Sequence, residues 1–118
     1  MLRTMLLFVA LATAGSGQAA ELWCMPDTLC NATGCDSTTD EEMSVRLKDL
    51  AEQTTTLRTH AEDVVMSRTK EGDVVQWEGK NEYGGKEFLA WRPSDGAFTY
   101  LIRWDEGEST ATGLCEVQ

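Results

Sequence analysis

The stretch of residues 86–104 constrains the fold more than any other part of the chain. It contains two runs, at residues 88–92 and 97–104, in which bulky side chains alternate with others. Successive side chains of a β-strand point to opposite faces, so each run predicts an amphipathic strand. The runs flank a Pro-Ser-Asp-Gly segment, in which proline presets the backbone angle of a turn and glycine accepts the positive φ that closes it. Together they predict a β-hairpin.

The chain beyond residue 40 repeats this pattern of short strands and short turns. Alternating or β-branched residues predict strands at residues 43–48, 54–59, 64–69, 74–78 and 110–117. A loop is predicted at residues 49–53, and polar, glycine-containing turns are predicted at residues 70–73 and 105–108. A chain of this size buries one face of such a meander only by curling it. The sequence therefore predicts an all-β domain, a small antiparallel meander that closes into a barrel or a two-layer sandwich.

Residues 43–51 allow a second interpretation. The preceding residues 39–42 have the form of a helix capping box, and Met43, Leu47 and Leu50 recur at helical spacing. The same segment also alternates as a strand does, and the threonine run that follows it favours strand because branched side chains lose rotamer freedom in helices. A strand is the preferred prediction, and a short helix is the alternative.

Residues 1–20 have the three parts of a secretory signal peptide, namely a positive charge at Arg3, a short apolar run and an end of small residues. The apolar run is too short to cross roughly 30 Å of hydrocarbon as a helix, so a membrane anchor is not expected. Cleavage after Ala19 and after Ala20 both fit this pattern. We therefore expect a single exported domain over residues 21–118, in the periplasm or outside the cell, with no membrane insertion after cleavage.

The charge of this domain is strongly negative. The chain carries 10 basic and 20 acidic residues, and removal of Arg3 with the signal peptide leaves nine basic residues and a net charge of −11. Such a domain repels phosphate backbones and anionic lipid headgroups, so binding to nucleic acid or to a membrane surface is not expected. A basic protein would be attracted to it.

All four cysteines, Cys24, Cys30, Cys35 and Cys115, lie in the predicted mature domain, and an even number in a small exported domain predicts two disulfides. The short spacing makes a local Cys30–Cys35 bridge plausible, with Cys24 then paired to Cys115. The pairs Cys24–Cys35 and Cys30–Cys115 fit almost as well. In both arrangements one bridge joins the two ends of the domain, and residues 31–34 are expected to form a turn between cysteines.

No catalytic, cofactor-binding or metal site is expected. His60, the only histidine, is expected to be a solvated strand residue. The acidic residues at 105–108 lack the spaced ligands of a calcium loop, and the cysteines lack the C-x-x-C spacing of zinc and redox sites. With 20 acidic residues, a pair of carboxylates says nothing about catalysis without geometry.

Alternation in the central hairpin also places aromatic side chains on its outer face. If the large aromatic residues of the second strand face inward, either Phe88 or Trp91 must face outward on the first strand. An exposed tryptophan flanked by Arg92 and Arg103 would be a natural contact point for a partner or a sugar.

The two ends of the domain carry a resemblance to known proteins. Trp23 directly precedes Cys24, and Cys115 lies in the last predicted strand of a small, acidic, exported domain. In these features the chain resembles the periplasmic C-type lysozyme inhibitors, and more broadly the small exported bacterial β proteins with no known role. The resemblance implies a disulfide-tied barrel that blocks a basic enzyme by inserting a loop. The inhibitors' Ser-Gly-x-x-Tyr loop motif is missing here, and residues 81–85 supply only Tyr83 and two glycines, so Tyr83 is a possible partner contact rather than a transferred inhibitory residue.

These observations predict an exported, non-enzymatic binding protein whose partner is another protein, for example a basic lysozyme. The alternative is a small-ligand carrier with a calycin-like apolar cavity lined by tryptophan and phenylalanine. A protein binder predicts a filled interior and an exposed aromatic residue beside charged ones. A carrier predicts an open barrel mouth with an apolar lining.

Overall fold

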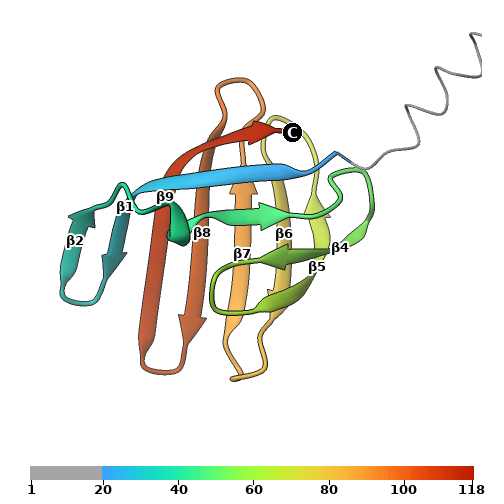
Figure 1. Cartoon of the computed structure of the whole chain (residues 1–118). Coiled ribbons are helices and arrows are strands. Elements are labelled where there is room, and N and C mark those ends of the chain that lie inside the picture. The colour runs from blue at the N-terminus through green and yellow to red at the C-terminus, as the bar shows by residue number, and fades with distance from the viewer. Residues whose placement is uncertain (1–19) are drawn as a thin grey trace, which may run out of the picture.

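The computed structural model describes residues 20–118 as a closed antiparallel β-barrel (Figure 1). The predicted signal peptide, apart from its last position, lies outside the described residues. The strands are β1 (Leu22–Asn31), β2 (Gly34–Ser37), β3 (Val45–Leu47), β4 (Thr54–Arg58), β5 (Asp63–Lys70), β6 (Val75–Lys80), β7 (Lys86–Trp91), β8 (Ala97–Trp104) and β9 (Gly107–Val117). No helix among these residues is long and apolar enough to cross a membrane.

The sheet closes because β1 pairs with two strands that are far apart in the sequence. The first residues of β1 pair with β3, and the whole strand pairs with β9, so β1 and β3–β9 form an eight-stranded barrel. The remaining strand, β2, pairs only with the second half of β1 and forms a hairpin that projects from the barrel, on the left in Figure 1. The all-β prediction is confirmed, and of the two predicted architectures the chain adopts the barrel.

The strand predictions from residue 43 onward agree with the structure within two or three residues. The β8 strand has the predicted bounds, and β7 begins two residues earlier than predicted. The helical alternative for residues 43–51 is wrong. A single 3-10 turn, Glu41–Met43, is capped by the Asp40 carboxylate, which accepts from the Glu42 N–H at 2.9 Å, and β3 follows it.

The first two strands were not predicted from the sequence. The β1 strand contains Pro26, which has no N–H for the sheet, and the register with β9 shifts between Pro26 and Thr28. The short β2 strand is exposed along its whole length and therefore has no hydrophobic face to reveal it. The turn predicted between cysteines is confirmed, because Asn31 and Gly34 pair across the β1–β2 hairpin.

Both disulfides join residues that lie directly opposite each other on paired strands. Cys24 of β1 bonds Cys115 of β9, and Cys30 of β1 bonds Cys35 of β2. This is the local arrangement, and the interleaved one is excluded. The Cys24–Cys115 bond therefore crosses the seam at which the first and last strands close the barrel.

Large apolar side chains form a core inside the barrel. The fully buried ones come from alternate positions of β1 and β3–β7: Leu22, Leu47, Leu57, Met66, Trp77 and Leu89. Trp91 and Phe98 extend this core at the end of the barrel that carries the β7–β8 turn. An eight-stranded barrel is just wide enough for such side chains to fill it or for one small ligand to enter.

Candidate functional site

The end of the barrel opposite the β7–β8 turn holds a cavity of about 360 Å³. Its walls come from β1, β8 and β9, from the start of β3, and from the turn between β4 and β5. The β1–β2 hairpin contributes Cys30 and Asp36, so the local disulfide supports one wall. The apolar part of the lining is Leu29, Met43, Val45, Ala61, Ile102 and Ala111.

A buried carboxylate lies in the barrel wall next to this cavity. Glu87 shares the inward face of β7 with Leu89 and Trp91, and its side chain is fully buried. Tyr100, on the neighbouring strand β8, donates its hydroxyl to Glu87 Oε1, and the Asn81 side-chain amide donates to Glu87 Oε2 at 2.8 Å. Each carboxylate oxygen thus has one hydrogen-bond donor, as buried polar atoms in proteins usually do.

Tyr100 lines the cavity, and its hydroxyl keeps its proton. Burial raises the pKa of Tyr100 well above its usual range, and the hydrogen bond to Glu87 and the charge of that carboxylate raise it further. The phenol is therefore the donor in this hydrogen bond. Tyr100 joins the buried carboxylate to the cavity, because it lines the cavity while it contacts Glu87.

Glu62 is a second carboxylate at the same end of the barrel, and it lines the cavity directly. Burial raises the pKa of Glu62, and the negative charge of Glu87 raises it further, with a smaller contribution from Glu82. The carboxylate of Glu87 is therefore close enough to disfavour the charged form of Glu62.

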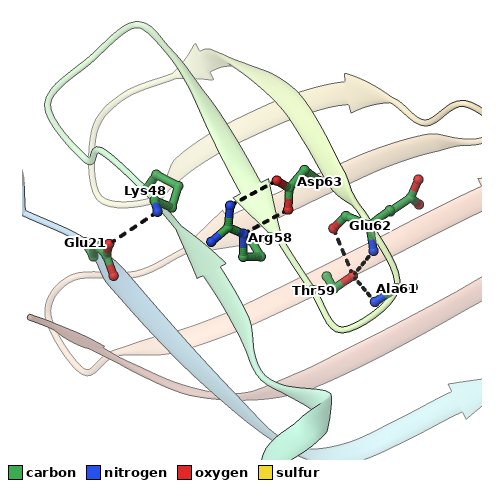
Figure 2. Close-up of polar contacts among 7 residues, drawn as sticks. All are labelled: Glu21, Lys48, Arg58, Thr59, Ala61, Glu62 and Asp63. Carbon is green, nitrogen blue, oxygen red and sulfur yellow. Dashed lines mark hydrogen bonds and ion pairs between the residues drawn. The ribbon is translucent and has the colours of Figure 1, made fainter.

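The β4–β5 turn fixes the position of Glu62. The Thr59 hydroxyl accepts from the N–H groups of Ala61 and Glu62 at 3.2 and 3.3 Å, and the Thr59 N–H donates to the Glu62 carbonyl at 3.0 Å. Arg58 and Asp63 form a two-pronged ion pair across the base of the turn. Figure 2 shows the Glu62 carboxylate pointing away from that ion pair.

The turn between β6 and β7 is organised by Asn81, which is only 6 % exposed. The Asn81 side-chain oxygen Oδ1 accepts from the N–H groups of Tyr83 and Gly85 at 3.0 and 2.8 Å, while the side-chain NH2 group donates to Glu87. Gly84 has φ +88°, a conformation that favours glycine. This turn holds the Tyr83 side chain in solvent, where it is 73 % exposed.

The structure does not bring the four predicted contact residues together at one place. Trp91 packs in the core at 9 % exposure, so Phe88 is the outward aromatic residue of β7. Arg92 lies in the β7–β8 turn, far from Tyr83 along the strands, and pairs with Asp95 at 2.8 Å. The hydrogen bonds that the Asp95 carboxylate accepts from Arg92 and from the Ala97 N–H lower its pKa to about 2. Arg103 pairs with Glu108 at 2.9 Å.

Arg103 also lies over the Phe88 ring, with the guanidinium carbon 5.4 Å from the ring centroid. It is near the β6–β7 turn, since it is paired with Lys86 in the sheet. His60 is exposed in the β4–β5 turn and contributes to the cavity rim. Within residues 20–118, no three His, Cys, Asp or Glu side chains are grouped so that they could hold a metal ion.

Comparison with known proteins identifies no relative. No family model matches the chain, and no curated protein or solved structure matches it.

Three residues of this site, Asn81, Glu87 and Tyr100, were not predicted to act together. The alternation of β7 carried a usable signal, because counting back two residues from Leu89 places Glu87 on the inward face. Nothing in the sequence indicated that Asn81 would reach back to it from the preceding turn.

Proposed function

We propose that this protein is a small, non-enzymatic binding protein that takes the apolar part of a ligand into the cavity at the open end of its barrel. The cavity itself supports this function best. Its volume of about 360 Å³ lies within the range of small-molecule pockets, and its lining combines apolar side chains with a few polar groups. The remaining interior is filled by large side chains, so a ligand would occupy one end of the barrel.

We place this binding in an oxidising compartment outside the cytoplasm. The two disulfides favour such an environment. The predicted signal peptide supports export, to the periplasm or beyond the cell.

Filling the cavity mouth is expected to prevent binding of an uncharged apolar probe, N-phenyl-1-naphthylamine. Ala61 lies in an exposed turn at the rim, so Ala61→Trp places an indole over the entrance without disturbing the core. We expect at least a tenfold weaker probe affinity, measured by the rise in probe fluorescence, which corresponds to about 1.4 kcal/mol.

Val65→Trp is the matched control, because Val65 is 65 % exposed on the outer face of β5 and does not line the cavity. It should bind the probe as the unmodified protein does. Equal affinities for both variants, or no binding by the unmodified protein, would rule out the cavity as the site.

A second candidate function is capture of a basic protein partner by the β6–β7 turn. The observation in its favour is that Asn81 holds this turn in one conformation with Tyr83 exposed, since a preorganised aromatic side chain is a good anchor at an interface. Glu82 adds a negative charge beside it, and the charge of the Glu82 carboxylate raises the pKa of Tyr83.

Tyr83→Ala is expected to weaken binding to a basic lysozyme by about tenfold or more at physiological salt if this turn is the interface. Val65→Ala should leave the affinity unchanged. Binding that is strong at low salt and disappears at physiological salt, with no difference between the two variants, would instead show nonspecific attraction to an acidic protein.

A further inference from the structure

The cavity has an uncompensated negative charge along its lining. Asp36 and Glu62 supply carboxylates to the lining. Among the described residues that line the cavity, the other titratable side chains are His60 and the Tyr100 phenol, and none is a lysine or an arginine. An apolar cavity with this charge is complementary to a ligand that is both apolar and positively charged.

Among residues 20–118, neither Glu62 nor Glu87 forms an ion pair with a basic side chain. The ion pairs among the described residues use other carboxylates, those of Glu21, Asp63, Glu71, Asp95 and Glu108. Glu87 accepts hydrogen bonds from the neutral donors Tyr100 and Asn81, which do not cancel its charge. The two inner acids therefore form a negative centre that a positive group in the cavity would neutralise.

We infer that the ligand of this cavity is an organic cation, with an apolar body against the barrel wall and an ammonium group paired with Glu62. This inference rests on the proposed binding function and specifies its ligand class. The Tyr100 ring, which also lines the cavity, is a second favourable neighbour for a cation at this place. Glu87, behind Tyr100, adds attraction without contacting the ligand.

Binding of a cation should depend on pH in a definite direction. The pKa of Glu62 is raised by burial and by Glu87, with Glu82 also contributing, and His60, Asp36 and Tyr100 are the other titratable groups lining the cavity. A cation prefers ionised Glu62, so its affinity should increase as the pH rises through the pKa of that carboxyl and then level off. A neutral ligand of the same shape gains nothing from this ionisation.

Two compounds of nearly identical shape test the inference: 1-naphthylmethylamine, which is a cation at neutral pH, and 1-naphthalenemethanol, which is neutral. By isothermal titration at pH 7 and physiological salt, we expect the amine to bind at least tenfold more tightly than the alcohol. Glu62→Gln should reduce that ratio to about twofold or less, and should remove the gain in amine affinity between pH 4 and pH 7.

Glu52→Gln is the control, since it makes the same change in net charge at an exposed position outside the cavity lining. Equal binding of amine and alcohol would overturn the inference and leave the cavity as an apolar site. An equal loss in the Glu52 and Glu62 variants would overturn it too, because the attraction would then be general. If neither compound binds and the uncharged probe also fails to bind, the proposed function itself is wrong.

Discussion

Replacing Cys24 and Cys115 together by alanine is expected to lower the free energy of unfolding by about 5 kcal/mol. The bond closes a loop with a sequence separation of 91, for which chain entropy alone gives about 4.6 kcal/mol. Cys24 is fully buried and Cys115 nearly so, so the lost sulfur atoms also leave a small void in the core. Domains of this size have only about 5–15 kcal/mol of stability, so the variant should lose a third of its stability or more.

The matched control is the Cys30→Ala, Cys35→Ala variant, measured by urea unfolding beside the first. Its loop has a sequence separation of 5 and lies in a hairpin outside the barrel, so chain entropy gives a loss of about 2 kcal/mol. Because this hairpin forms part of the cavity wall, ligand affinity should fall in this variant even though the barrel stays folded. Equal losses of stability in the two variants would contradict the prediction that the Cys24–Cys115 bond stabilises the protein more than the Cys30–Cys35 bond does.

The sequence was most informative where one strand face is apolar and the other polar. The β8 strand could be bounded correctly because Phe98 and Tyr100 alternate with smaller or polar side chains over its whole length. The β1 strand could not be found, since it is interrupted by Pro26 and pairs with strands from both ends of the domain. Barrel closure depends on that long-range pairing, and the alternation of side chains along the chain does not predict which distant strands pair.

The candidate site could not be predicted from the sequence, for a different reason. A glutamate within a strand is ordinarily assigned to the outer face, because burying its charge is costly unless donors meet it. The donors for Glu87 come from Tyr100, which looked like a simple core aromatic, and from Asn81 in a turn. The cavity is also bounded by segments far apart in sequence, such as the β1–β2 hairpin and the β4–β5 turn, so its existence depends on the closed barrel.

Tyr100→Phe is expected to cost about 3 kcal/mol of unfolding free energy, more than the loss of one neutral hydrogen bond. It removes the donor to Glu87 Oε1 and leaves a fully buried carboxylate oxygen without a partner, and unpaired buried charge is among the most destabilising defects. Glu87→Leu should cost about 2 kcal/mol, because it leaves only the neutral hydroxyl and the Asn81 amide unpaired.

The double variant, with both Tyr100→Phe and Glu87→Leu, should then be more stable than the sum of the two losses predicts, by about 2 kcal/mol, because the carboxylate that Tyr100→Phe leaves unpaired is absent from it. Urea unfolding of the four proteins measures this coupling, and additive losses would mean that the two groups do not act as a unit.

The pKa of Glu62 gives an independent check, measured by NMR titration in the Glu87→Leu variant. It should fall towards its usual value without reaching it, since the charge of Glu87 is gone while burial, the larger cause of the raised pKa, persists. An unchanged pKa would separate Glu62 from Glu87 and remove the negative centre from the cavity.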